Sequence, residues 1–71
     1  MSFPAFHLDV ERTRLAMARK CYDWKDLARV SGVPASTLCR LQRGDGTGSK
    51  RIGQIARALE VDVTEIIKDQ E

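Results

Sequence analysis

WKDLARVSGVPASTLCRLQRGD, residues 24–45, is the stretch of sequence that decides the fold. Its first half is apolar at a helical period, through Trp24, Leu27, Ala28 and Val30. Asp23 stands directly before it, where a helix N-cap is expected. Gly32 follows, and a glycine ends a helix in the left-handed conformation without strain. The pattern therefore predicts a short helix that is capped by Asp23 and stops at Gly32.

A second short helix is predicted directly after Gly32. Pro34 suits its first turn, and its inward positions are Val33, Leu38 and Leu41. Its outward positions carry small or hydrogen-bonding side chains and one guanidinium: Ala35, Ser36, Thr37 and Arg40. Two short helices hinged at a glycine have the layout of a helix-turn-helix over about 24–43. The outer face of the second helix, about 34–43, fits a DNA major groove about 12 Å wide, so we interpret the chain as a DNA-binding module.

The distribution of charge agrees with this interpretation. The net charge of +2 is too small to be diagnostic. Residues 33–51, however, hold four basic side chains and one acidic side chain, a net of +3, whereas residues 52–71 hold two basic and five acidic side chains, a net of −3. The positive segment coincides with the second helix and the loop after it, as a phosphate-facing surface requires.

Length and composition predict one small domain, residues 1–71, with 1–7 as an N-terminal arm. No stretch approaches the roughly 18 apolar residues of a membrane span, and the N-terminus lacks the features of a signal peptide. Cys21 and Cys39 make no disulfide framework, which favours a reducing cytoplasm. Together with the lone His7 they lack zinc-ligand spacing. No paired carboxylates or nucleophile–base set is found, so we expect no enzyme and no cofactor.

The remaining helices are read from apolar spacing. A first helix is predicted from about Leu8 to Lys20, but two stripes compete for its inward face: Leu8, Leu15, Ala18 and Tyr22 against Val10, Thr13, Met17 and Cys21. A flexible turn, residues 44–48, precedes a fourth helix that is capped by Ser49. Its apolar residues recur at i, i+3, i+4 and i+7, as Ile52, Ile55, Ala56 and Leu59. Asp62 caps a fifth, short helix with Val63, Ile66 and Ile67 inward. No strand-like alternation is found, so the predicted fold is all-α with five helices.

From Trp24 to Ile67 the chain resembles the XRE family, the helix-turn-helix regulators that include phage repressors and Cro proteins. The resemblance is carried by Leu27-Ala28, Gly32-Val33, Ser36-Thr37-Leu38, Arg43-Gly44 and Ile55-Ala56-Arg57-Ala58-Leu59-Glu60-Val61. The Gly-Thr-Gly-Ser loop followed by Lys50-Arg51-Ile52 is similar to the DNA-binding domains of lambdoid repressors. The resemblance implies a phage-repressor-like domain. It leaves open whether the chain is a free-standing Cro-like regulator or the DNA-binding domain of a longer repressor.

Several positions depart from the family pattern. Trp24 stands where the family usually has Gln, and Ser49 stands where Pro often opens the fourth helix. Cys21 replaces the glycine that commonly ends the first helix, which argues against a left-handed residue there. Met17 and Gln42 occupy the positions of an Arg–Glu ion pair, which is replaced on both sides.

The resemblance also implies which residues contact DNA. Base edges are expected to be read by Ala35, Ser36, Thr37 and Arg40. Arg40 is the strongest candidate, because two parallel donors match O6 and N7 of guanine, worth about 1–3 kcal/mol of discrimination; the alternative is a phosphate contact or an intramolecular ion pair. Phosphates are expected at Trp24, Lys25, Arg43, Ser49, Lys50 and Arg51. They are also expected at the amide groups that begin the helix at Trp24 and the fourth helix at Ser49. Solvated surface is the alternative for each basic residue.

The predicted function is that of a transcriptional regulator that binds a palindromic operator as a homodimer, with half-sites about 34 Å apart. The dimer contact is expected near Val63, Ile66 and Ile67 and the 45–49 loop. Repression by occluding RNA polymerase and activation by touching it both stay open. So does the placement of Phe3 and Phe6, over the core, in a dimer contact or in an arm. The alternative function is a protein-interaction module of antitoxin or anti-repressor type.

Overall fold

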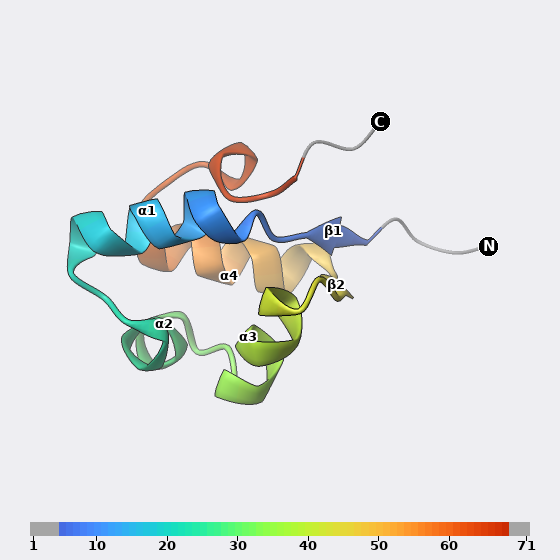
Figure 1. The fold of residues 1–71 in the computed structure, drawn as a ribbon, viewed down its shortest axis with the longest axis horizontal. Coiled ribbons are helices and arrows are strands. Elements are labelled where there is room, and N and C mark those ends of the chain that lie inside the picture. The colour runs from blue at the N-terminus through green and yellow to red at the C-terminus, as the bar shows by residue number, and fades with distance from the viewer. Residues whose placement is uncertain (1–4, 69–71) are drawn as a thin grey trace.

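Four α-helices make up most of residues 5–68, the part of the chain that the computed structural model describes (Figure 1). In chain order the elements are β1 (Phe6–His7), α1 (Val10–Lys20), α2 (Trp24–Ser31), α3 (Ala35–Gln42), β2 (Gly46–Thr47), α4 (Ser49–Leu59) and the 3-10 helix η1 (Val63–Glu65). The fold is therefore mostly helical, as predicted, with a small two-stranded sheet that was not predicted. Phe3 and most of the N-terminal arm lie outside the described residues. No helix within residues 5–68 has the length and apolar character to cross a membrane.

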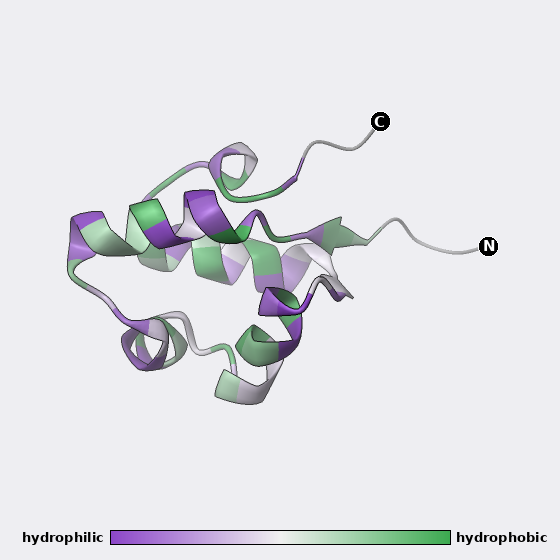
Figure 2. Ribbon diagram, viewed as in Figure 1, coloured by the Kyte–Doolittle hydropathy of each residue, from purple (hydrophilic) through white to green (hydrophobic). Residues whose placement is uncertain are grey.

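Helix α4 lies at the centre of the packing. It contacts α1, α2 and η1, while α2 also contacts α3. Each α-helix carries both hydrophilic and hydrophobic segments (Figure 2), and the hydrophobic ones meet in a single core. The buried hydrophobic residues are Leu8, Ala16, Met17, Leu27, Val33, Leu38, Leu41, Ile52, Ile55, Ala56, Ala58, Leu59 and Ile66. The predicted stripe of α4 and the three predicted inward positions around α3 all lie in this core, which confirms that part of the sequence interpretation.

The structure decides the register of α1. Thr13, Ala16 and Met17 face the core, whereas Leu15 is 64% exposed. Thr13 is fully buried without cost to its hydroxyl, because Oγ1 donates a hydrogen bond to the backbone oxygen of Asp9 at 2.8 Å. Asp9 also caps α1, so the helix begins at Val10 and not at Leu8. Thr13 and Met17 of the second stripe are therefore inward, but its last member, Cys21, is exposed. Leu8 of the other stripe is buried as well, although it lies before the helix.

Two predictions about helix ends were wrong. Cys21 does adopt the left-handed conformation, with φ 59° and ψ 38°, and ends α1 as a glycine usually does. Ser49 is not the cap of α4. The N-cap is Gly48, which forms no side-chain cap hydrogen bond, and Ser49 is the first residue inside the helix.

Helix α2 follows its prediction closely. The Asp23 side chain accepts a hydrogen bond from the Asp26 backbone N–H at 2.7 Å, and Gly32 ends the helix at φ 79°. Val30 was expected inward and is 44% exposed. Its position lies at the margin of the inward face, whose centre is set by Leu27 and Ala28.

The segment after α4 is shorter than predicted. In place of a fifth α-helix there is one 3-10 turn, Val63–Glu65, capped by Asp62 as expected. Val63 is 37% exposed, Ile67 is partly buried, and Ile66 is completely buried. A single turn leaves too few residues for an apolar stripe, so the three side chains point in different directions.

The small sheet joins the N-terminal segment to the turn before α4. Phe6 pairs with Thr47 and His7 pairs with Gly46 in antiparallel register. A side chain at position 46 would not fit, because its Cβ would lie 2.6 Å from the Cβ of Ala5. The turn at residues 44–48, predicted to be flexible, is thus held by β1. Strands of two residues leave no alternation in the sequence, which is why they were not predicted.

Candidate nucleic-acid interface

Helix α3 presents one continuous exposed line. Leu38 and Leu41 anchor its opposite side in the core. The exposed line contains the residues spaced i, i+3, i+4 and i+7, namely Ser36, Cys39, Arg40 and Arg43. The predicted base-reading residues Ser36 and Arg40 lie on this line. Ala35, which is exposed, and Thr37, which is partly buried, lie beside it.

Cys39 is a surface residue that the sequence interpretation missed. It is exposed as a free thiol between Ser36 and Arg43 on the outer line of α3. The signal was present in the spacing, since position 39 lies three residues after Ser36 and four before Arg43. A cysteine behaves as a small apolar residue, so the sequence interpretation considered Cys39 for disulfide and zinc chemistry and not for the exposed line of the helix.

The basic side chains near α3 and the start of α4 form no ion pair with the described residues, 5–68. The ion pairs of residues 5–68 join Arg12 to Asp9, Lys20 to Glu60 and Arg29 to Asp26. None of these pairs includes Arg40, Arg43, Lys50 or Arg51. The first three of those side chains are exposed and Arg51 is partly buried. The intramolecular ion pair considered for Arg40 is therefore not formed within the described chain.

The N-termini of α3 and α4 share an unusual property. Pro34 precedes α3 and Gly48 precedes α4, and neither provides a side-chain cap. Neither helix has an acidic residue in its first turn. At the start of α3 the Thr37 N–H donates to the Pro34 oxygen at 3.0 Å, whereas no side chain accepts from the first N–H groups of either helix. The helix dipole adds partial positive charge at both ends. Each end can accept an anion.

The N-terminus of α2 is different, although the sequence suggested it as a phosphate site. Asp23 and Asp26 form a capping box there: each side chain accepts a hydrogen bond from the other residue's backbone N–H, at 2.7 and 3.0 Å. The hydrogen bond from the Asp23 backbone, followed by the Arg29 guanidinium at 3.1 Å, lowers the pKa of Asp26. The lowered pKa favours the ionised form of Asp26 where a phosphate was expected, and both side chains of the capping box already accept the backbone N–H groups there.

Two predicted contacts on α2 remain open to solvent. Lys25 is exposed. Trp24 packs partly against the core, and its indole N–H forms no hydrogen bond to any of residues 5–68. Both residues keep a donor that can reach an anion beside α2.

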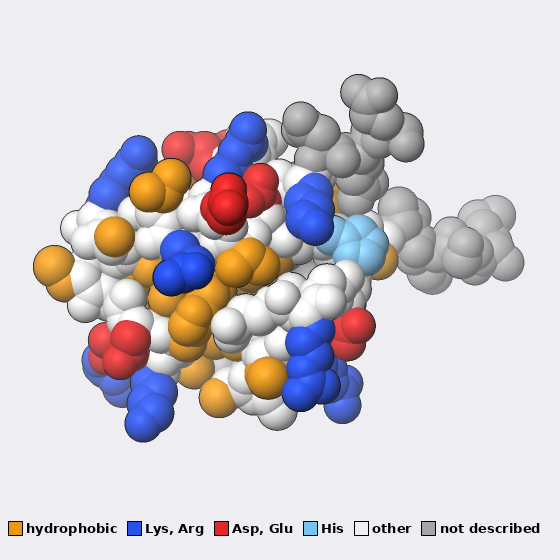
Figure 3. Space-filling view, in the orientation of Figure 1, with side chains coloured by type: hydrophobic (Ala, Val, Ile, Leu, Met, Phe, Trp, Pro, Cys, Tyr) orange, Lys and Arg blue, Asp and Glu red, His pale blue; other side chains and the backbone are white. Residues whose placement is uncertain are grey.

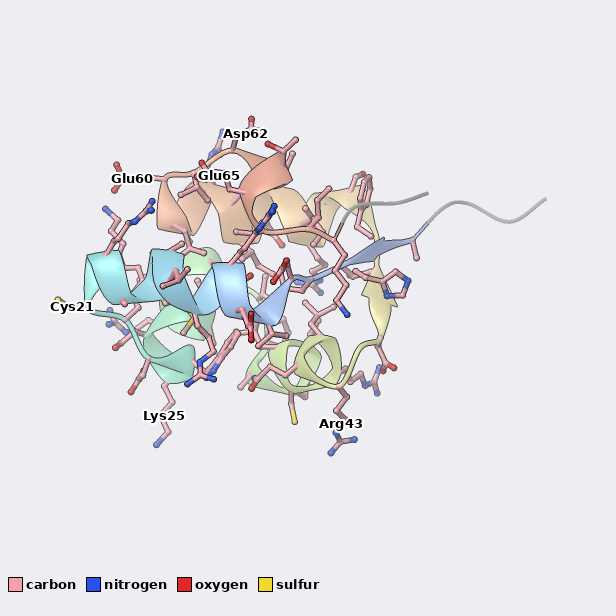
Figure 4. The ribbon with its side chains drawn as sticks, turned by 45° about the horizontal axis from the view of Figure 1, so that its top comes forward. Cys21, Lys25, Arg43, Glu60, Asp62 and Glu65 are labelled. Carbon is pink, nitrogen blue, oxygen red and sulfur yellow. The ribbon has the colours of Figure 1, made fainter. Side chains whose placement is uncertain are left out.

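Lys25 and Arg43 project from α2 and from the end of α3 toward the same side of the molecule, whereas Glu60, Asp62 and Glu65 lie at the opposite edge (Figure 4). In the space-filling view, Lys and Arg side chains lie at the lower edge, over α2 and α3, and others lie over the upper part of the molecule (Figure 3). We call the set Ser36, Cys39, Arg40, Arg43, Ser49, Lys50 and Arg51 the α3–α4 edge.

The residues predicted for a dimer contact do not form one surface. Ile66 is completely buried in the chain's own core, and its backbone oxygen accepts a hydrogen bond from the Asp9 N–H at 2.7 Å. Ile67 forms an antiparallel bridge with Leu8. The prediction that Ile66 offers its side chain to a second copy is wrong. Of the three, Val63 keeps the most exposed side chain.

No group of three or more His, Cys, Asp or Glu side chains within residues 5–68 is arranged to hold a metal ion. Comparison with known proteins found no relative: no protein-family model matches the chain, and neither the curated proteins nor the solved structures contain a match. The functional argument therefore depends on the geometry and charge of the α3–α4 edge.

Proposed function

We propose that the chain is a sequence-specific DNA-binding transcriptional regulator of the phage repressor and Cro type. Helix α2, the Gly32 turn and α3 act as a helix-turn-helix, and α3 enters the major groove. The observation that carries this proposal is the α3–α4 edge, whose four basic side chains form no ion pair with residues 5–68 and lie in the second half of α3, at its C-cap and in the first turn of α4. Both helices also begin without a side-chain cap. Duplex DNA supplies the counter-charge that this edge lacks.

Base reading is assigned to the outer line of α3. Arg40 is exposed and unpaired, so its guanidinium is free to donate two hydrogen bonds to a guanine. Ser36 can donate or accept one turn earlier, and Ala35 offers a methyl group to a thymine methyl. Cys39 lies on the same line of α3 as Ser36 and Arg40, and it contacts the base edges of the major groove through a small apolar surface.

Phosphate binding is assigned to both sides of that line. Arg43 follows α3, and Lys50 stands in the uncapped first turn of α4, beside the free amide groups. Trp24 and Lys25 hold the other strand from α2. Asp23 and Asp26 occupy the N-terminus of α2. The phosphate beside α2 is therefore held by the side chains of Trp24 and Lys25 and not by the helix amides.

A pair of chains on a palindromic site follows from the small reading surface. One short helix touches too few base pairs for selective binding, so two half-sites about 34 Å apart are needed. Because Ile66 is part of the core, the pair forms on DNA and not through that side chain.

The test begins with selection of bound duplexes from a random DNA pool at about 0.15 M ionic strength. A palindromic consensus is expected. Arg40→Ala should then weaken binding to the selected duplex by about tenfold to a hundredfold while the circular dichroism spectrum is unchanged, since a bidentate contact is worth about 1–3 kcal/mol. Arg57→Ala, an exposed arginine near the other end of α4, is the matched control. Equal DNA affinity of Arg40→Ala and the unmodified protein would reject groove reading and leave a protein-interaction module as the explanation.

A further inference from the structure

The outer face of α1 carries a large apolar side chain that the fold does not use. Leu15 is 64% exposed, the most exposed of the large hydrophobic side chains in residues 5–68. It stands between two hollows, one lined with Glu11 and Arg14 and the other with Arg12, Ala16, Arg19 and Glu65. Hydrophobic side chains are visible among charged ones over this part of α1 in Figure 3.

The hollow that includes Glu65 combines an apolar wall with charged side chains. It is a cleft of about 190 Å³ between α1 and η1, with Leu15 and Ala16 as its apolar wall. Arg12 and Arg19 stand at its margin. Glu65, the acidic residue of the cleft, already accepts a hydrogen bond from the Asp62 N–H at 3.2 Å as part of the η1 cap.

The cleft is lined by two basic side chains, Arg12 and Arg19, and one acidic side chain, Glu65, so its lining is net positive. Residues 10–20 as a whole contain four basic side chains and one acidic side chain. Lys20 is paired with Glu60, and Arg12 is held through its Nε, 3.7 Å from Asp9, so both Nη groups of Arg12 remain free. Arg14 and Arg19 form no ion pair with residues 5–68. An occupant must therefore bring negative charge together with an apolar group.

We infer that the α1 face formed by Arg12, Leu15, Ala16 and Arg19 is a docking surface for an acidic protein segment, which places one apolar side chain against Leu15 and carboxylates on Arg12 and Arg19. Guanidinium groups suit this role because they bind carboxylates through two parallel hydrogen bonds. An exposed leucine gives the apolar contact that a free anion cannot use.

Charge disfavours face-to-face pairing of two copies, because the arginines Arg12 and Arg19 of one α1 face would lie against the same arginines of the other. The surface is also separate from the α3–α4 edge. The cleft is bounded by Glu65, which lies on the opposite side of the molecule from Lys25 and Arg43 (Figure 4). The inference is therefore independent of DNA binding.

The test uses a displayed library of random peptides, depleted on the Leu15→Ser/Arg19→Glu double variant and then selected on the unmodified protein. The expected consensus is an apolar residue flanked by Asp or Glu. A synthetic peptide of that sequence should shift the amide resonances of α1 around Leu15. Its affinity should fall roughly tenfold for Leu15→Ser, and by a similar factor for Arg19→Glu, since burial of a leucine is worth about 1.5–3 kcal/mol.

Val30→Ser and Arg57→Glu are the matched controls, because they change an exposed apolar residue and an exposed arginine away from the cleft. Both should leave peptide affinity within about twofold. No enriched peptide after depletion, a consensus without acidic residues, or resonance shifts confined to another face would overturn the inference. Binding to vesicles of anionic lipid that requires Leu15 and Arg19, in place of peptide binding, would also overturn it.

Discussion

The N-termini of the helices divide the molecule into two unlike regions. Aspartates cap α1, α2 and η1, where Asp9, Asp23 and Asp62 accept backbone hydrogen bonds at 3.1, 2.7 and 3.1 Å. No side chain caps α3 or α4. The acidic partners of the described ion pairs are Asp9, Asp26 and Glu60, and none of them belongs to the α3–α4 edge. The starts of α1, α2 and η1 are capped by side chains of the chain itself, whereas the starts of α3 and α4 are not, and the basic side chains of the α3–α4 edge form no ion pair with residues 5–68.

This difference separates the helix starts that contribute to stability from those to which we assign the proposed DNA binding. A side-chain cap contributes about 0.5–2 kcal/mol relative to alanine, and only a few tenths of a kcal/mol relative to glycine. The chain keeps that contribution at three helix starts and omits it at the two that border the exposed line of α3. We infer that the omission favours an external anion, because the same N–H groups cannot serve a cap and a phosphate.

Charge reversal at the α3–α4 edge should give the largest effect. Arg43→Glu/Lys50→Glu should weaken binding to a selected duplex roughly a hundredfold, because two phosphate contacts become repulsions. The slope of log affinity against log salt concentration should fall in magnitude by about two. Filter binding or fluorescence anisotropy across a salt series measures both. Arg57→Glu, near the far end of α4, is the control that should keep the original slope. An unchanged slope for the double variant would mean that Arg43 and Lys50 do not contact phosphates and that the α3–α4 edge does not bind DNA.

A cap introduced at α4 should sharpen the comparison further. Gly48 has an ordinary φ of −81°, and an added Cβ meets nothing within 4 Å, so Gly48→Asp and Gly48→Ser should both fold. Each should change the free energy of unfolding by only a few tenths of a kcal/mol. Gly48→Asp should lower DNA affinity by about tenfold, because its carboxylate occupies the phosphate position, whereas Gly48→Ser should not. If the two variants bind DNA equally, the N-terminus of α4 does not hold a phosphate.

A substitution at the end of α1 should change stability without changing DNA affinity. Cys21 holds a left-handed conformation that glycine adopts without strain. Cys21→Gly should raise the free energy of unfolding by about 0.5–1 kcal/mol, measured by urea denaturation, and should leave DNA affinity unchanged. A change in DNA affinity would show that the capped region takes part in binding.

The smallest effect is expected from acid. The hydrogen bonds from Thr64 lower the pKa of Asp62, and the Asp23 backbone and Arg29 lower that of Asp26, both from an ordinary value of 3.8. A carboxyl whose pKa is lower in the folded state binds fewer protons there than in the unfolded state. Its stabilising contribution is therefore complete above its unfolded pKa and is lost as the pH falls through the folded pKa.

Thermal midpoints of the unmodified protein should accordingly be level near neutrality and should decrease below about pH 4. Asp26→Asn/Asp62→Asn keeps side chains that can cap but removes both titrating groups. Its midpoint should decrease less between about pH 6 and about pH 3. Equal acid sensitivity of the two proteins would mean that other groups control acid unfolding.

Sequence alone predicted the elements in which pattern and packing agree. The stripe of α4 and the Asp23 and Gly32 boundaries of α2 follow directly from spacing and capping chemistry. The face of α1 did not, because a polar residue, Thr13, is buried against its own backbone while Leu15 faces solvent. No rule of hydrophobic periodicity anticipates that exchange.

The candidate interface was predicted in outline. Exposure of Ser36 and Arg40 follows from the inward positions of Leu38 and Leu41, which the sequence identified. The burial of Ile66 depends on the contact between the two ends of the chain, and a single sequence contains no signal for a contact across nearly its whole length. The spacing of Asp23 and Asp26 predicts the capping box of α2, and that capping box argues against the phosphate site expected at the same helix end.

The segment from His7 to Asp9 has a topological consequence. On one side His7 pairs with Gly46, and on the other Asp9 donates to the Ile66 oxygen while the Lys68 N–H donates to the His7 oxygen at 2.9 Å. The two ends of the described chain are thereby fastened into a ring. The entropy cost of closing the chain is the same whether one or several contacts hold the two ends together. Breaking one of these contacts while the others remain therefore releases little conformational freedom. Truncation before residue 9 or after residue 65 should therefore loosen both ends together.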